Sequence, residues 1–217
     1  MSTEMLGLLV NALGETSYMV GASAAVALLI GLPLGVILVA TSRGHILEQP
    51  VLNRLLSGVV NATRSVPFII LMVAIIPFTR LIAGTSIGTS AAIVPLSIAA
   101  IPFLARLVET SLLEVDPGLI EAARAMGATP RQIIAKVLVP EALPGVILGV
   151  TITIISLIGY SAMAGAIGGG GLGDLAVRYG YQRFRVDIMA ATVVILIAQV
   201  QIVQFCGDTL SRWLNKK

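Results

Sequence analysis

The sequence has few charged residues and contains long stretches with none at all. Only 12% of its 217 residues are charged, 57% are hydrophobic, and the mean hydropathy is +0.98. Soluble domains carry about 25% charged residues. This scarcity of charge excludes an ordinary soluble domain, and it predicts an all-α polytopic membrane protein, since helices satisfy their own backbone hydrogen bonds in lipid.

The chain also has a single cysteine, Cys206, and a single histidine, His45. One cysteine cannot form an intrachain disulfide, and the two residues cannot make a His/Cys metal cluster, so we predict no metal site. His45 falls in a connecting loop, where we expect a solvated side chain. No nucleophile can therefore be paired with a histidine base inside a span, and the sequence predicts a protein that is not an enzyme.

Nucleotide-binding signatures are missing or lack their structural context. No G-x-x-x-x-G-K-[ST] loop occurs, so we expect this chain to bind neither ATP nor Mg²⁺. Gly168–Gly173 formally matches G-x-G-x-x-G, but a membrane span precedes it and a short outer loop follows, whereas a dinucleotide site needs a βαβ unit. We interpret these glycines as a flexible turn. The net charge of +3 is carried by loops and does not indicate nucleic-acid binding.

Uncharged stretches predict five transmembrane helices in one domain, residues 1–217. Each is long enough to cross a bilayer, which takes about 20 residues. The second contains Arg64, which we expect near one end, where its long side chain can reach the interface. The predicted spans are Thr16–Ser42, Leu55–Thr79, Leu81–Ala105, Ala142–Gly173 and Ile188–Gly207.

The distribution of Lys and Arg predicts the orientation. If the C-terminus is cytoplasmic, most of the 14 basic residues fall on the cytoplasmic side, as the positive-inside rule requires. With five spans, the N-terminus then lies outside. Small residues four positions apart predict close helix packing at Gly31 and Gly35, Gly145 and Gly149, and Ser161 and Gly165.

The most polar segment, residues 113–140, is called the insert below; in this orientation it is cytoplasmic. Asp116-Pro117 predicts a helix start, Gly127 a left-handed helix end, and Thr129 with Gln132 a second start with a capping box. We expect Pro140 and Pro144 to bound this unit. Composition alone favours an ordinary solvated cytoplasmic loop, and the alternative is a surface that a soluble partner binds. The apolar face of the second helix consists of Ile133, Ile134, Val137 and Leu138.

The insert resembles the EAA signature of ABC-importer permeases through Glu121-Ala122-Ala123, Gly127 and Pro140. Val137 and Val139 stand where that signature more often has Ile and Leu, which keeps the apolar character. Five further segments resemble the methionine-importer subfamily: Arg64–Ile69, Ile76–Arg80, Gly84–Gly88, Gly159–Met163 and Gly168–Gly173.

This resemblance implies the type I ABC importer permease fold in a bacterial cytoplasmic (inner) membrane. It implies alternating access in a homodimer with two ATP-binding subunits, which carry ATP and Mg²⁺, and an external methionine-binding protein. Membrane lipid surrounds the spans. The implied substrate is L-methionine, with D-methionine left open. The residues implied to couple the permease to its ATPase are Glu121, Ala122, Ala123, Met126, Gly127, Pro130 and Pro140.

For the substrate path we expect Tyr160, Ser161 and Met163, because a thioether ligand favours an apolar, polarizable lining with a few polar groups. The alternative is that Met163 only fills a gap between helices. Two other functions remain open: a permease for another small amino acid, and a secondary transporter that needs no ATP. Ion-coupled carriers usually place carboxylates near mid-membrane, and this sequence has few ionisable residues inside its spans.

Overall fold

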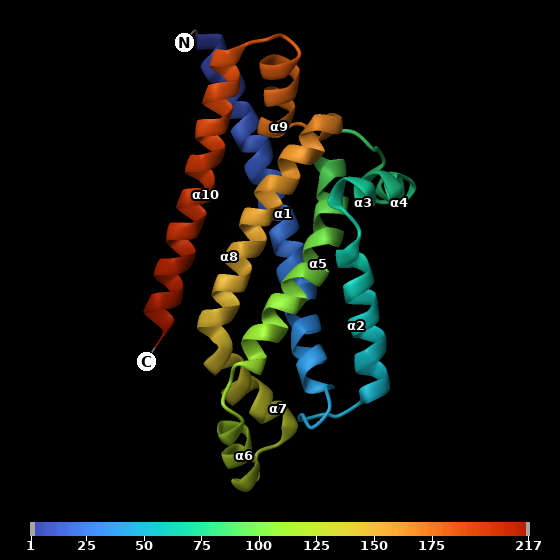
Figure 1. Ribbon diagram of the computed structural model, residues 1–217, viewed down its shortest axis with the longest axis vertical. Helices are drawn as coiled ribbons and strands as arrows, with labels where there is room; N and C mark the ends of the chain where they lie inside the picture. The colour runs from blue at the N-terminus through green and yellow to red at the C-terminus, as the bar shows by residue number, and fades with distance from the viewer. Residues whose placement is uncertain (1–2, 216–217) are drawn as a thin grey trace.

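The computed structural model describes residues 3–215, so residues 1–2 and 216–217 of the predicted domain lie outside the described residues. Every regular element in the described part is helical (Figure 1). The α-helices are α1 (Thr3–Ala40), α2 (Pro50–Ser65), α3 (Phe68–Ala74), α4 (Ile76–Ala83), α5 (Thr89–Leu113), α6 (Pro117–Ala125), α7 (Pro130–Ile133), α8 (Val139–Ala164), α9 (Gly171–Leu175) and α10 (Val186–Leu214). Three π-helical segments are η1 (Ile134–Leu138), η2 (Gly165–Gly169) and η3 (Ala176–Tyr181).

Four helices are long and apolar enough to cross a membrane, and a fifth span exists if the bent pair α2 and α3 counts as one. The predicted span Leu55–Thr79 is therefore not one straight helix. Its axis turns by 101° between α2 and α3. Pro67 causes the break, because the residue before a proline is pushed out of helical geometry, and Val66 is extended with φ −84° and ψ 124°.

Two further span limits differ from the prediction. The stretch Leu81–Ala105 does not begin as one helix, because α4 ends at Gly84 with φ 73° and α5 starts only after Gly88 with φ 98°. The stretch Ala142–Gly173 is broken after α8, where Gly168, Gly170 and Gly171 all have positive φ. Glycines with positive φ therefore end α4 and the helical run after α8, although the sequence remains apolar at both positions.

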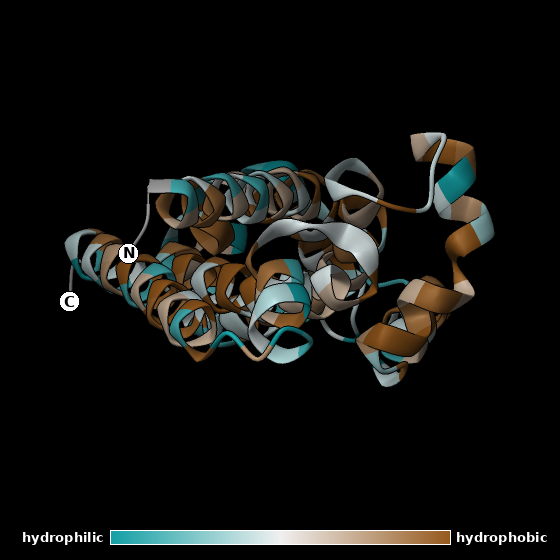
Figure 2. Cartoon of the chain, turned by 90° about the horizontal axis from the view of Figure 1, so that it is seen from above, coloured by the Kyte–Doolittle hydropathy of each residue, from teal (hydrophilic) through white to brown (hydrophobic). Residues whose placement is uncertain are grey.

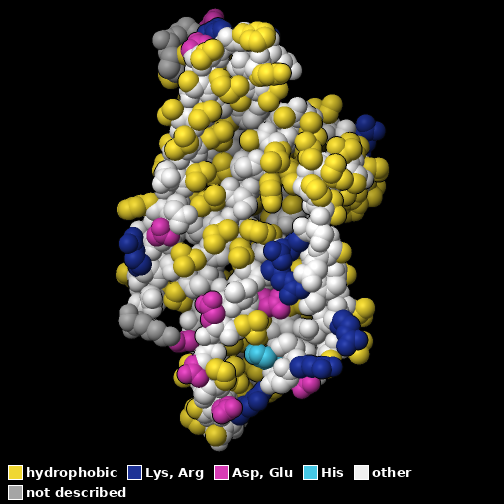
Figure 3. All heavy atoms as spheres, in the orientation of Figure 1, with side chains coloured by type: hydrophobic (Ala, Val, Ile, Leu, Met, Phe, Trp, Pro, Cys, Tyr) yellow, Lys and Arg dark blue, Asp and Glu magenta, His cyan; other side chains and the backbone are white. Residues whose placement is uncertain are grey.

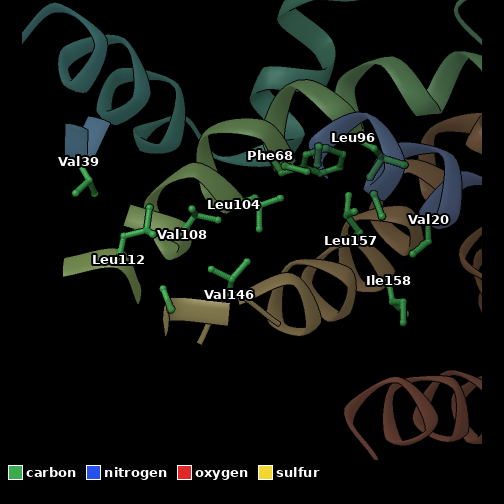
Figure 4. Close-up of a cluster of buried hydrophobic side chains, with 14 of the residues drawn as sticks. Val20, Val39, Phe68, Leu96, Leu104, Val108, Leu112, Val146, Leu157 and Ile158 are labelled. Atoms are coloured by element: carbon green, nitrogen blue, oxygen red, sulfur yellow. The ribbon is translucent and has the colours of Figure 1, made fainter. Parts of the chain in front are cut away.

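The core lies where α1, α5 and α8 meet, and Figure 4 shows Leu104, Val146 and Leu157 among its side chains. The predicted small-residue pairs make this contact close. A Cβ at Gly35 would lie 2.7 Å from the Ala105 carbonyl oxygen, and one at Gly149 would lie 3.0 Å from the Leu107 Cβ. Many large hydrophobic side chains are exposed, as expected for helices in lipid. Figure 2 shows how hydrophobic residues are distributed along the helices.

The glycine-rich turn is held against the first helix. The Glu15 carboxylate accepts a hydrogen bond of 2.6 Å from the Gly171 amide, and Thr16 Oγ1 accepts one of 2.9 Å from the Leu172 amide. Gly171 and Gly173 are buried, and a side chain at Gly171 would collide with Thr16. The predicted turn is present, but it is closely packed where we expected it to be flexible.

The long helices alternate in direction. α1, α5 and α10 run away from the end that holds the N-terminus, whereas α2 and α8 run back toward it (Figure 1). The short helices α6 and α7 protrude at the end of the bundle opposite the N-terminus. The insert is therefore presented at one end of the molecule, away from the glycine-rich turn.

Candidate functional site

The first helix of the insert has the predicted ends. The Gly118 amide donates to Asp116 Oδ1 at 2.8 Å, which caps the start of α6. At the other end Gly127 has φ 78°, its amide donates to the Arg124 carbonyl, and the Ala128 amide donates to the Ala123 carbonyl at 3.0 Å. This pair of bonds is a Schellman motif, which satisfies carbonyls at the helix end and reverses the chain.

The second helix begins as predicted and ends differently. Thr129 and Gln132 form the capping box, with the Thr129 amide donating to Gln132 Oε1 at 2.8 Å. Pro140 does not bound the unit, because α7, η1 and α8 follow one another without an intervening loop from Pro130 to Ala164. A proline disrupts the α-helical bonding pattern, and the π turns of η1 come immediately before it, so the helix changes its winding there and does not stop.

The insert exposes the residues of the EAA signature. Ile120 and Ala123 face inward and share a buried cluster with Ile133 and Leu138, which fixes α6 on the start of the long helix. Met126 is 81% exposed. Of the seven coupling residues implied by the resemblance, only Ala123 is buried; the exposed ones are Glu121, Ala122, Met126, Gly127, Pro130 and Pro140. The arrangement is a capped, mixed-charge surface with Met126 as an apolar projection.

His45 lies nearer to this surface than its sequence suggested. Its ring, in the connection between α1 and α2, is half-buried, although we expected a solvated side chain. Burial lowers the pKa of His45 below its ordinary value of 6.5, and the positive charge of Arg124 on α6 lowers it further. The loop after the first span thus adjoins the insert, which no local sequence signal indicates.

The three residues expected on the substrate path lie on α8 but do not form one cluster. The Tyr160 ring stacks on Phe68 of α3, with ring centroids 4.6 Å apart. Ser161 is buried, and its hydroxyl donates to the Ile158 carbonyl at 2.7 Å, so it faces the protein interior. Met163 is 47% exposed and does not fill a gap within this chain. Together with Ile152 it lies on an open face of α8.

Arg64, which we predicted near one end of a span, lies in the last turn of α2, directly before the bend into α3. Its guanidinium lies 5.9 Å from the ring centroid of Phe103, which is close to the middle of α5. Beside it, Arg106 Nη2 donates to Asn61 Oδ1 at 3.0 Å, and Arg106 Nη1 pairs with Glu109. Figure 3 shows basic side chains gathered over this part of the molecule, below a largely hydrophobic region. Sequence reasoning missed this polar seam between α2 and α5, because it depends on which helices pair.

Comparison with known proteins identifies the family. Residues 31–217 match the family of the binding-protein-dependent transport system inner membrane component. The chain belongs to this family. It is therefore a multi-pass inner-membrane protein and a transport subunit.

Two similar proteins and two solved structures agree with this family. The probable D-methionine transport system permease of Vibrio cholerae is 61% identical over 210 residues, 97% of this chain and 93% of that protein. The D-methionine transport system permease of Escherichia coli K12 is 57% identical over 165 residues, 76% of each. A structure described as an inward-facing conformation of the MetNI methionine ABC transporter has a TM-score of 0.97 and 52% identity, covering 100% of both chains. An amino acid ABC transporter crystallised with histidines, at 18% identity and TM-score 0.80, shares the fold. The predicted type I ABC importer permease fold is confirmed.

Proposed function

We propose that this chain is the membrane-spanning subunit of an ATP-driven methionine importer. The observation that carries the proposal is the match, over the full length of both chains and at 52% identity, to a chain of a methionine ABC transporter. Relatives named as D-methionine permeases support D-methionine as a substrate beside L-methionine. The same matches count against a secondary transporter, and they favour methionine over another small amino acid.

The partners follow from the same comparison and from the exposed insert. The permease works as a homodimer with two ATP-binding subunits. Each of these subunits binds one insert through Glu121, Met126 and their exposed neighbours. ATP and Mg²⁺ belong to those subunits. An external methionine-binding protein delivers the substrate, in keeping with the family to which this chain belongs.

In the orientation that we propose, the insert and the C-terminus are cytoplasmic and the N-terminus is outside. The excess of basic residues on the cytoplasmic side supports it. The end of the bundle that carries α6 and α7 then faces the compartment that contains ATP (Figure 1).

Alternating access follows from the continuity of the long helix. Because no loop interrupts the helix between Pro130 and Ala164, a displacement of the insert moves Met163, which lies near the far end of α8. In this mechanism the open face of α8 with Met163 and Tyr160 lines the path between the two copies. Ser161 lies behind this face, where its hydroxyl donates to the Ile158 carbonyl of the same helix.

Coexpression with a candidate ATP-binding subunit tests the proposal. We expect the two chains to copurify in mild detergent. With an external methionine-binding protein added, the reconstituted complex should take up L-methionine when ATP is supplied on the side of the insert. Uptake of L-methionine without ATP, or copurification with no uptake of either enantiomer, would contradict the proposed function.

A further inference from the structure

Arg64 lies in an unusual position for an exposed guanidinium. It belongs to α2, and it lies over Phe103 near the middle of α5, a helix long enough to span the bilayer. Its side chain is exposed on the surface of this single chain. An arginine near the bilayer centre costs about 2.5 kcal/mol or more when it faces lipid, so such residues normally face a water-filled cavity or a protein partner.

The neighbouring arginine is neutralised, but Arg64 is not. Arg106 pairs with Glu109 and receives Asn61 Oδ1 and the Ser57 carbonyl as further acceptors. None of the ion pairs within residues 3–215 involves Arg64. The seam between α2 and α5 therefore carries one surplus positive charge, whose hydrogen-bond donors are free for an anion.

Arg64 is also connected through the chain to the residues expected on the substrate path. It precedes the bend at Pro67, directly after which Phe68 stacks on Tyr160 of α8. Met163, which is exposed, lies three positions after Tyr160 on α8. Arg64 therefore lies four positions before an aromatic ring that contacts a residue expected on the substrate path.

We propose that Arg64 lines a water-filled part of the translocation path and binds the α-carboxylate of the transported amino acid. This inference rests on the proposed function, because it names the group of the substrate that this site recognises. Guanidinium and carboxylate form charge-assisted, often bidentate hydrogen bonds, and these are stronger than neutral ones. The bond is temporary, and it offsets the loss of hydration of the carboxylate while the substrate passes the middle of the membrane.

A cysteine at this position tests both parts of the proposal. Arg64→Cys is made in a Cys206→Ala background and reconstituted with the ATP-binding subunits and the methionine-binding protein. We expect uptake of L-methionine to fall about tenfold or more, the effect of losing about 1.4 kcal/mol of binding to the passing substrate. A thiol reagent that attaches an ammonium group should restore uptake to within about threefold of the parent, since it returns a cation. A neutral methylating thiol reagent should not restore it.

The controls separate the possible failures. Arg54→Cys removes the same charge from an exposed position nearer the start of α2 and should leave uptake within about twofold. Arg64→Lys should transport better than Arg64→Gln, which keeps the proposal testable if the cysteine variant does not assemble. Full uptake by Arg64→Cys, equal rescue by the neutral reagent, or a thiol that the ammonium reagent cannot reach would overturn the inference. If the Cys206→Ala parent itself takes up no methionine, the proposed function fails instead.

Discussion

Gly127 determines how the insert reverses direction between α6 and α7. Its φ of 78° lies in the left-handed region, where a Cβ costs about 1–2 kcal/mol and a β-branched side chain is less suited still. We expect Gly127→Val to leave the permease inserted in the membrane but to loosen α6, so that ATP hydrolysis no longer drives uptake efficiently. The ratio of methionine taken up to ATP hydrolysed in proteoliposomes measures this coupling.

Ala125→Val is the matched control for this experiment. It adds the same side chain at an exposed position in the last turn of α6, where the backbone is helical. We expect it to keep the wild-type ratio. A wild-type ratio in Gly127→Val as well would show that the left-handed turn does not contribute to coupling.

His45 should make stability depend on pH. Burial and the charge of Arg124 lower the pKa of His45 in the folded chain below the ordinary value of 6.5 that applies in the unfolded chain. At a pH between the folded and the unfolded pKa, the unfolded chain therefore binds a proton that the folded chain does not. Stability is therefore independent of His45 above about pH 7.5 and falls as the pH decreases through 6.5 toward the lowered pKa. The midpoint of thermal unfolding should drop on acidification in the wild type.

Two variants identify His45 as the source of this dependence. His45→Gln should show a smaller drop over the same pH range, because the group that titrates is gone. Arg124→Gln should reduce the drop only in part, since burial, the larger cause, remains. An identical drop in the wild type and in His45→Gln would assign the pH dependence to other groups.

Residues with local constraints were predictable from the sequence, and residues with tertiary constraints were not. Asp116, Gly127 and the pair Thr129 and Gln132 act on backbone groups within a few positions, so their types alone predicted the caps. The depth of Arg64 depends on the partner helix of α2, which a single sequence does not specify. The half-buried ring of His45 depends likewise on where α6 packs.

The contact between α1 and α5 has no room for side chains at its small residues. A Cβ at Gly35 would lie 2.7 Å from both the Ala105 carbonyl oxygen and the Val108 Cβ. We expect Gly35→Val to separate the two helices and to lower the free energy of unfolding by about 1–3 kcal/mol or more, as overpacking does. Thermal unfolding of the purified complex measures the loss.

Gly21 on the same helix provides the control. A Cβ there would meet no atom within 4 Å, so Gly21→Val should cost little and gain slightly in helix propensity. Equal unfolding midpoints for the two valine variants would show that the α1–α5 contact can yield to an added side chain.

At the level of elements, the sequence predicted that membrane helices exist but placed several of their ends wrongly. An apolar stretch is compatible with a straight span, a bend or a buried turn, because all three need hydrophobic side chains. Pro67 bends one predicted span by 101°, and Gly168, Gly170 and Gly171 end another. At Pro140 the prediction was wrong in the other direction: we expected the unit to end there, but the helix continues through it.

The whole molecule should present its two ends to opposite sides of the membrane. In a Cys206→Ala background, we expect Glu4→Cys to react with an impermeant thiol reagent from outside and Asn215→Cys from the cytoplasmic side. Both positions are exposed, so accessibility within the fold does not limit either reaction. Labelling intact cells and then inverted membrane vesicles measures the two sides.

The five-span topology depends on this result. Reaction of both cysteines from one side would mean that the bent pair α2 and α3 enters and leaves the membrane on the same face, leaving only the four long helices as spans. The side of the membrane on which the insert lies would then also have to be reassigned.

The bond between Glu15 and Gly171 also has a consequence for biosynthesis. Its partners are 156 positions apart in the sequence. At about 5–20 residues per second, a ribosome needs roughly 10–30 s to deliver Gly171 after Glu15 has emerged. During that interval the carboxylate of the first helix has no glycine amide to accept from. The final tertiary structure at the end of the bundle that holds the N-terminus can form only when translation is nearly complete, so a ribosome that stalls before α9 releases a chain in which this end is unfinished.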